Sequence, residues 1–385
     1  LEMPEKTIKM HQPDIGDLEK QYLTETLSSG LLAGNQKTTK DCEQLINDIT
    51  GSKASFLTTS CTHSLEIAAL SLDFKEGDEV IVPSYSFVST ALAFFMHGAV
   101  PRFCDVKRED LNIDENKLDN LINEKTKAIC VLHYGGKACN IEQVLQIASK
   151  YNLKVIEDNA HGLGGKLNQK VLGSFGSISC LSFHETKNLT CGEGGAVCIN
   201  DEELIEKIKF IREKGTNRAA FFEGKIDRYN WIEKGSNYLP SELQSSVLKA
   251  QLERFDEIQL KRVSIWNTYQ ENLSDLCKKY EIVLPSVNSN VVRTHHIFHL
   301  LFKEDLLAKN LIHHLNRKKI QATSHYRPLN KAPFILNQLS IKDIDPCPVA
   351  EQAADCMVRL PLSSRMTSSD AERVINEVKN FIVKN

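Results

Sequence analysis

The chain has 385 residues, more than one compact core usually fills, so its length predicts two domains. It carries 47 basic and 50 acidic residues with no long run of one sign, which argues against a nucleic-acid-binding or membrane-surface protein. Its eleven cysteines form no Cys-x-x-Cys pair, and its most apolar long window, residues 82–100, contains several Ser and Thr residues. We therefore expect a cytoplasmic location and no membrane span.

From about residue 54, short apolar runs alternate with helical patterns. The predicted strands are Ala54–Thr58, Glu79–Pro83, Val100–Val106, Ala128–His133, Leu153–Glu157, Ile178–Phe183 and Ala196–Ile199. The helices predicted between them are Ser64–Leu72, Ser86–His97, Ile141–Tyr151 and Glu203–Lys214. This alternation indicates a mostly parallel α/β sheet, in which ligands bind at the carboxyl ends of the strands.

A hydroxyl-rich turn follows the first predicted strand, in the sequence Thr58-Thr59-Ser60-Cys61-Thr62-His63-Ser64. A helix N-terminus offers free N–H groups and the positive end of the helix dipole, and hydroxyl groups add further donors. The turn is therefore suited to a phosphate group. Ser and Thr also cap helices routinely, so plain N-capping is the alternative interpretation.

Two further motifs follow predicted strands. The sequence Pro83-Ser84-Tyr85-Ser86-Phe87 places an aromatic side chain where it can stack on a flat ring, although core aromatics are far commoner. The sequence Glu157-Asp158-Asn159-Ala160-His161 ends a strand in carboxylates. Asp158 could hold a pyridine nitrogen protonated, which lets the ring absorb electrons from a substrate carbanion. A helix cap followed by a surface histidine is the alternative.

Lys187 lies in the run Ser182-Phe183-His184-Glu185-Thr186-Lys187-Asn188, after an apolar segment and just before Gly192-Glu193-Gly194-Gly195. An amine attacks an aldehyde only when unprotonated, so a lysine that binds pyridoxal phosphate needs its pKa lowered by burial or by a neighbouring positive group. The end of a buried strand is a suitable place for such a lysine. By its local sequence alone, a solvated surface lysine is the alternative.

Beyond about residue 250 the pattern changes. A long helix is predicted from Ser241 to about Tyr269, followed by a strand at Ile297–Phe302 and helices near Leu306–Leu315 and Ser369–Phe381. We therefore expect a large domain over residues 1–250 and a smaller α+β domain over residues 251–385.

The sequence lacks the motifs for two other classes of ligand, metal ions and nicotinamide cofactors. His295, His296 and His299 have no matching carboxylate or cysteine spacing, so we expect a structural or substrate-lining role for them. His184-Glu185 lacks the second histidine of His-Glu-x-x-His, so no metal site is predicted. The run Gly162-Leu163-Gly164-Gly165 does not give the Gly-x-Gly-x-x-Gly of a nicotinamide dehydrogenase after the first strand.

Together and in this order, the motifs resemble those of the DegT/DnrJ/EryC1/StrS family of sugar aminotransferases. The resemblance covers nearly the whole chain, and its further motifs are Gly30-Leu31-Leu32-Ala33-Gly34, Ser241-Glu242-Leu243-Gln244, His325-Tyr326-Arg327-Pro328-Leu329 and Leu360-Pro361-Leu362. It implies the fold of type I transferases that depend on pyridoxal 5′-phosphate, with a large α/β domain and a smaller C-terminal α+β domain. Asn159, Cys61 and Asn330 depart from the commonest pattern, and the last lies near the expected substrate pocket.

The resemblance also implies roles for individual residues. Lys187 would form the Schiff base with the cofactor and move the proton between the substrate carbon and the cofactor, while Asp158 pairs with the pyridine nitrogen. Phe87 would stack on the ring, and His161 would lie near its phenolic oxygen.

The phosphate would be held by Thr62, by the backbone N–H of His63 and by Ser182. Asn237, in Gly235-Ser236-Asn237-Tyr238, matches an asparagine that in this family reaches the phosphate from the neighbouring subunit. A homodimer with shared active sites follows from that match.

Within the family, His184–Asn188 and Arg212–Arg218 are most similar to dTDP-4-amino-4,6-dideoxygalactose transaminases. This implies glutamate as donor and a nucleotide-linked 4-keto-6-deoxyhexose as acceptor, with dTDP or UDP as the nucleotide and polysaccharide biosynthesis as the setting. His325 and Tyr326 are the expected substrate contacts. The nucleotide base and the configuration at C4 stay open.

Three related functions are the alternatives. A 3-keto-sugar aminotransferase would share the chemistry. A sugar dehydratase that uses the same cofactor would have histidine in place of Lys187. A non-catalytic or regulatory member of the fold would be expected to lose Lys187 or Asp158, and both are present.

Overall fold

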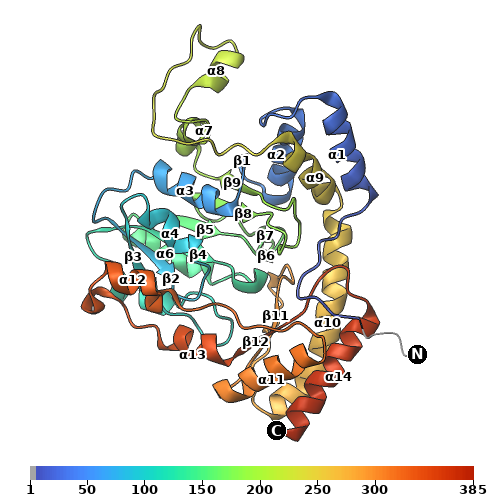
Figure 1. Cartoon of the computed structure of the whole chain (residues 1–385). Helices are drawn as coiled ribbons and strands as arrows, with labels where there is room; N and C mark the ends of the chain where they lie inside the picture. The colour runs from blue at the N-terminus through green and yellow to red at the C-terminus, as the bar shows by residue number, and fades with distance from the viewer. Residues whose placement is uncertain (1–5) are drawn as a thin grey trace.

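A seven-stranded sheet forms the centre of the protein in the computed structural model, which describes residues 6–385 (Figure 1). The strand order is β1-β9-β8-β5-β4-β2-β3, and β9 alone runs antiparallel to its neighbours in this sheet. The strands are β1 (Ala54–Thr58), β2 (Glu79–Pro83), β3 (Val100–Cys104), β4 (Thr126–Leu132), β5 (Lys154–Asp158), β8 (Ile178–Ser182) and β9 (Gly195–Ile199). The prediction of a mostly parallel α/β sheet is confirmed.

Helices cover both faces of this sheet, because its strands are apolar on both sides. One face packs against α3 (Cys61–Ser71), α4 (Ser89–Phe95) and α7 (Ile205–Arg212). The other face packs against α2 (Lys37–Thr50), α5 (Leu118–Leu121), α6 (Ile141–Lys150) and α9 (Glu242–Glu253), with α1 (Asp17–Ser29) lying on α9. Helix α6 shows why: Ile141, Val144, Ile147 and Ala148 recur at helical spacing and are all buried.

A second core lies in the C-terminal part of the chain. It is built from α10 (Phe255–Lys279), α11 (Asp305–Arg317), α14 (Ser368–Lys384) and the antiparallel pair β11 (Phe298–Leu301) and β12 (Met357–Leu360). Ile8 belongs to this core too, because its backbone pairs with Ile320. The boundary at residues 250 and 251 stays a prediction.

The remaining elements connect the two cores or extend from them. Helices α12 (Pro333–Gln338) and α13 (Pro348–Cys356) return to the first core, and a small sheet joins β10 (Val291–Val292), β6 (Lys166–Leu167) and β7 (Lys170–Val171). Short 3₁₀ turns lie at Glu115–Lys117, Tyr134–Gly136, Glu202–Leu204, Leu329–Lys331 and Ile341–Asp343. Among residues 6–385, no helix is both long and apolar enough to cross a bilayer.

The predicted single helix from Ser241 to Tyr269 is wrong. The chain forms two helices, α9 and α10, which meet at Arg254. The Arg254 guanidinium pairs with Asp14 and Glu19 at the N-terminal end of the chain, and these distant carboxylates fix the bend. The local sequence holds no sign of this contact.

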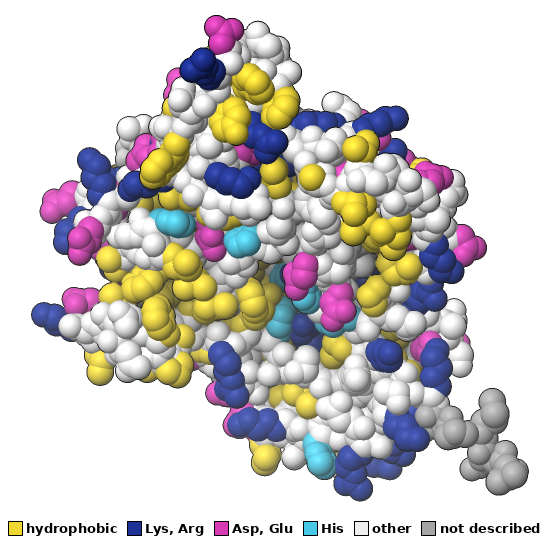
Figure 2. Space-filling view, turned by 45° about the horizontal axis from the view of Figure 1, so that its top comes forward, with side chains coloured by type: hydrophobic (Ala, Val, Ile, Leu, Met, Phe, Trp, Pro, Cys, Tyr) yellow, Lys and Arg dark blue, Asp and Glu magenta, His cyan; other side chains and the backbone are white. Residues whose placement is uncertain are grey.

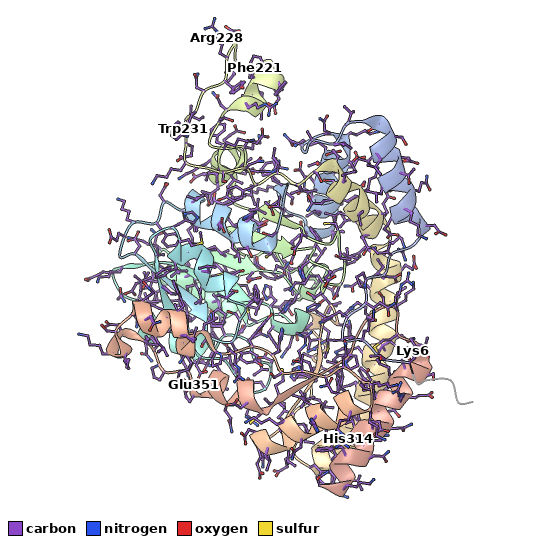
Figure 3. All side chains as sticks on the ribbon, viewed as in Figure 1. Lys6, Phe221, Arg228, Trp231, His314 and Glu351 are labelled. Carbon is purple, nitrogen blue, oxygen red and sulfur yellow. The ribbon has the colours of Figure 1, made fainter. Side chains whose placement is uncertain are left out.

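A segment of residues 217–232 projects from the body and carries α8 (Arg218–Phe222) (Figures 1 and 3). Phe221, Phe222, Tyr229 and Trp231 on this segment are all exposed, and Trp231 is 81% exposed. Figure 2 shows hydrophobic side chains gathered on this projection and histidines around a hollow nearer the middle of the molecule.

Candidate active site

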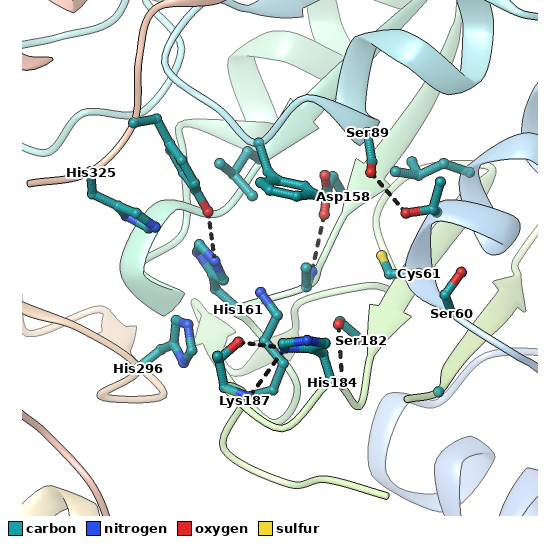
Figure 4. Close-up of a pocket in the computed structure, with 18 of the residues that line it drawn as sticks. Ser60, Cys61, Ser89, Asp158, His161, Ser182, His184, Lys187, His296 and His325 are labelled. Atoms are coloured by element: carbon teal, nitrogen blue, oxygen red, sulfur yellow. Dashed lines mark hydrogen bonds between the residues drawn. The ribbon is translucent and has the colours of Figure 1, made fainter. Parts of the chain in front are cut away.

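The carboxyl ends of the parallel strands bring the predicted cofactor motifs to one edge of the central sheet. Asp158 ends β5, Ser182 ends β8, and α3 begins just after β1. They border a cavity of about 590 Å³ (Figure 4). Eight of the ten predicted site residues line it: Thr62, Phe87, Asp158, His161, Ser182, Lys187, His325 and Tyr326.

Lys187 enters the cavity from the loop after β8, and Figure 4 shows its side chain extending toward the centre. The loop is held in part by the Lys187 N–H, which donates to the His184 carbonyl at 2.9 Å. Burial lowers the pKa of the Lys187 amine, although the nearby groups of Cys61 and Asp158 act in the opposite direction. Within residues 6–385, Lys187 Nζ makes no hydrogen bond or ion pair, so the amine is free to react.

Asp158 is buried at the end of β5 and lies on the cavity wall. Its Oδ2 accepts a 2.7 Å hydrogen bond from Thr90 Oγ1, and its Oδ1 accepts from the Ala160 N–H at 3.2 Å. Burial raises the pKa of this carboxyl, and the two hydrogen bonds oppose that rise. In the described part of the chain, no Lys, Arg or His forms an ion pair with Asp158, so a protonated ring nitrogen would supply the missing cation.

The hydroxyl-rich turn does form the N-terminus of a helix. Ser60 caps α3 by accepting the His63 N–H at 3.1 Å, so the predicted His63 contact with a phosphate would require this hydrogen bond to open. His63 does not line the cavity, and its ring packs edge-on against Tyr238. The hydroxyls of Thr62 and Ser182 do line it, and Thr62 Oγ1 lies 2.8 Å from Ser89 Oγ.

His161 is a buried, neutral imidazole, because burial and nearby positive groups lower its pKa. Its Nδ1 accepts from the Gly135 N–H at 3.3 Å, which leaves a proton on Nε2 to donate to the Tyr326 hydroxyl at 3.3 Å. The ring also stacks on His296, with centroids 4.3 Å apart. This network fixes the imidazole on one wall of the cavity.

The two predicted substrate residues stack on each other. The His325 and Tyr326 rings lie 3.6 Å apart, and Tyr134 Oη is 3.1 Å from His325 Nδ1. Phe87 lines the same cavity, 57% exposed, with its ring tilted toward Tyr326 at 6.3 Å. An exposed aromatic ring at this place leaves a face for a flat ligand ring.

Asn237 lies outside the cavity of its own chain. Its side chain is exposed, and its backbone forms a bridge with Glu213. The predicted contact with a neighbouring subunit stays a prediction.

Sequence reasoning did not single out His11 or Arg359, which line the cavity, whereas His296, for which a structural or substrate-lining role was expected, lines it too. The run Met357-Val358-Arg359-Leu360 did carry a signal, because an arginine inside an otherwise apolar strand is unusual. The sequence around His11 carried no such signal, because the pairing of Ile8 with Ile320 brings this segment to the cavity.

The chain was compared with known families, and the model of the DegT/DnrJ/EryC1/StrS aminotransferase family matches residues 13–379. The chain belongs to this family. The predicted family membership is therefore confirmed, and the protein is an aminotransferase that depends on pyridoxal 5′-phosphate.

Relatives of this aminotransferase match it over nearly their whole length. The spore coat polysaccharide biosynthesis protein SpsC of Bacillus subtilis is 31% identical and covers 96% of each chain. The UDP-4-amino-4,6-dideoxy-N-acetyl-beta-L-altrosamine transaminase of Helicobacter pylori is 29% identical over 98% of this chain and all of its own. The solved structure of Helicobacter pylori PseC, an aminotransferase involved in the biosynthesis of pseudoaminic acid, is 28% identical over 99% of this chain and all of its own, with a TM-score of 0.89.

The residues present in the aminotransferase cavity fit the cofactor. A buried carboxylate without a cation, an unpaired lysine amine and two hydroxyls beside a helix N-terminus are complementary to its ring nitrogen, aldehyde and phosphate.

Proposed function

We propose that the protein transfers an amino group from glutamate to C4 of a nucleotide-linked 4-keto-6-deoxyhexose, giving a 4-amino-4,6-dideoxyhexose. The observation that carries the proposal is the free Lys187 amine, which shares one cavity with the buried carboxylate of Asp158. Two relatives support the substrate class, since one is named for a UDP-linked 4-amino-4,6-dideoxy sugar and the other for polysaccharide biosynthesis.

The cofactor would be held along one wall of the cavity. Asp158 would pair with its ring nitrogen, and Phe87 would cover one face of the ring. Thr62 and Ser182 would bind its phosphate at the N-terminus of α3. When bound, pyridoxal phosphate supplies an electron sink for the carbanion that forms at the substrate carbon.

Lys187 would carry the proton in both half-reactions. In the first, its neutral amine would remove the proton from the α-carbon of glutamate and pass it to the cofactor, and in the second it would take a proton back from the cofactor and deliver it to C4 of the sugar. Burial favours the neutral amine that the first step needs. His161 is held by hydrogen bonds to Gly135 and Tyr326, so it would place a neutral imidazole beside the reacting groups.

We also propose a homodimer with shared active sites in the cytoplasm. The exposed aromatic residues of the projecting segment support a contact with a second copy, and Asn237 lies just beyond that segment with its side chain exposed. All eleven cysteines are free, as expected in a reducing compartment.

A panel of dTDP-, UDP- and GDP-linked 4-keto-6-deoxyhexoses and the matching 3-keto sugars, each with glutamate as donor, tests the function. We expect turnover of at least one, with an amine at C4 in the NMR spectrum of the product and 2-oxoglutarate as coproduct. Turnover restricted to 3-keto sugars, or none with any keto sugar, would overturn the proposal. The C4 configuration of the product would also separate galacto from gluco products.

A further inference from the structure

Arg359 is a buried cation on the cavity wall with no anion beside it. Its side chain is 7% exposed, and within residues 6–385 no Asp or Glu forms an ion pair with it. Its Nε has no hydrogen-bond partner, and its Nη2 lies 3.4 Å from Nε2 of His11. A buried charge without a partner is strongly unfavourable, so an anion in the cavity would remove this penalty.

The strand geometry aims Arg359 at the cavity. Alternate residues of a strand face opposite sides, and in β12 Val358 and Leu360 belong to the C-terminal core. Met357 and Arg359 therefore face the other way, where Met357 packs into the first core. The backbone is fixed on its other side too, because the Arg359 N–H donates to the Thr323 carbonyl at 2.7 Å.

No group already in the cavity neutralises this charge. The cavity is lined by two carboxylates, of which Asp158 accepts from Thr90 and Glu193 lies 3.5 Å from His184. His11 is a neutral acceptor, because burial and the charge of Arg359 lower its pKa to about 3. Three tyrosines lie close enough to favour the charged guanidinium, Tyr134, Tyr326 and Tyr85.

Arg359 and the proposed phosphate position lie on different sides of the cavity. The backbone of Arg359 pairs with Thr323, two residues before His325, and His325 and His296 lie on one side in Figure 4. Ser60, Cys61 and Ser89 lie on the opposite side, at the start of α3 and α4. The cavity therefore offers two anion positions, and a bound phosphate fills one of them.

We propose that Arg359 binds a carboxylate of the dicarboxylic amino donor in the first half-reaction. A guanidinium presents parallel N–H donors that match the two oxygens of a carboxylate, and Arg359, whose Nε has no hydrogen-bond partner, lines this cavity. The proposal rests on glutamate being the donor, as proposed above. A diphosphate of the nucleotide sugar is the competing occupant.

The test separates the two half-reactions in the variants Arg359→Gln and Arg359→Lys, with Arg317→Gln, an exposed arginine of α11, as the control. In single-turnover experiments we expect Arg359→Gln to lower kcat/KM for glutamate by roughly tenfold to a hundredfold. Its kcat/KM for the keto sugar should stay within about twofold of wild type, because Arg359 binds only the donor. Arg359→Lys should recover part of the loss, and Arg317→Gln should behave as wild type.

Neutral donor analogues locate the contact. Wild type should use glutamate better than the amide in which the carboxylate bound by Arg359 is neutralised, whether that is the α-amide or the γ-amide. Arg359→Gln should lose this preference. Discrimination against both amides that is unchanged in the variant would overturn the proposal. A loss confined to the sugar half-reaction would also overturn it and assign Arg359 to the diphosphate.

Glutarate binding tests the role of Arg359 separately from the proposal that glutamate is the amino donor. Titration calorimetry of the holoenzyme should show that glutarate binds wild type at least about tenfold more tightly than Arg359→Gln. If wild type fails to use glutamate, the proposed donor is wrong, and equal glutarate affinities would then overturn the role of Arg359 as well. The variant should keep a thermal midpoint at or above that of wild type, because it removes a buried unpaired charge.

Discussion

Thr90 Oγ1 donates a 2.7 Å hydrogen bond to Oδ2 of Asp158 and so connects the first turn of α4 to the end of β5. The hydroxyl stabilises the charged form of a carboxyl whose pKa burial would otherwise raise further. Asp158, the proposed partner of the cofactor's ring nitrogen, therefore depends on a hydroxyl of helix α4.

Replacing Thr90 with Val removes this hydroxyl at nearly constant shape. The pKa of Asp158 should then rise further, so the carboxylate is lost at a higher pH and the acidic limb of the pH–rate profile moves to higher pH. We also expect turnover at neutral pH to fall about tenfold. Thr90→Ser keeps the hydroxyl and should retain the wild-type profile; an unshifted profile in Thr90→Val would contradict the role of this bond.

Lys187 should be the residue to which borohydride fixes the cofactor. We expect a yellow purified protein and, after reduction, a modified peptide containing Lys187 in the mass spectrum. Lys187→Ala should lower turnover by about 10⁴-fold while leaving the circular dichroism spectrum unchanged. A label on another lysine would contradict the assignment.

The same lysine should destabilise the cofactor-free protein. The pKa of Lys187 is lowered in the folded state from 10.5, so the cost of holding its charged form in the folded protein is present at neutral pH and disappears as the pH rises through 10.5. Lys187→Met should therefore raise the thermal midpoint of the apoprotein at pH 7. The gain should shrink as the pH rises toward and above 10.5, which differential scanning calorimetry at several pH values would measure.

Glu157 on the opposite face of β5 should be structural. Its carboxylate accepts N–H groups from Gly173, Phe175 and Gly176 and lies 2.9 Å from His133 Nε2. Glu157→Gln should lower the free energy of unfolding by about 3 kcal/mol in urea titrations, because an amide offers one acceptor oxygen where the carboxylate accepts from three N–H groups. The exposed control Glu203→Gln should change it by less than about 0.5 kcal/mol.

The pH dependence of this contribution has a definite sign. Burial would raise the pKa of Glu157, but the bonds from His133, Gly176 and Gly173 hold it below 4.5. The stabilisation is therefore present above pH 4.5 and is lost as the pH falls through the lower folded-state value. The wild-type advantage over Glu157→Gln should be constant near neutrality and should shrink in acid; an advantage that grows in acid would contradict this account.

The projecting segment should carry part of the dimer contact. Trp231→Glu and Phe222→Glu should each weaken dimerisation by about 30-fold, because a charge replaces an apolar side chain in the proposed interface. Light scattering during size-exclusion chromatography at several concentrations would measure the shift. Val383→Glu alters an equally exposed apolar residue of the C-terminal helix and should leave the dimer intact; equal effects of all three changes would contradict this placement.

The strands of the central sheet could be predicted from the sequence because each is a short apolar run bounded by polar turns. Ala54–Thr58 and Glu79–Pro83 agree with β1 and β2 residue for residue. Since ligands of parallel sheets bind at the carboxyl ends of the strands, Asp158, Ser182 and the turn at Thr62 could also be expected at one edge. The element bounds differ most where a distant contact intervenes, as at Arg254.

The sequence by itself determined the strands of the sheet and the family, and it predicted the lysine with its aspartate, because periodicity and motif order are local properties. Only the tertiary structure decided that His11 and Arg359, 348 residues apart, meet in one cavity, and that the latter has no carboxylate partner there. Charge compensation and burial depend on which segments the fold brings together, and no local pattern encodes them.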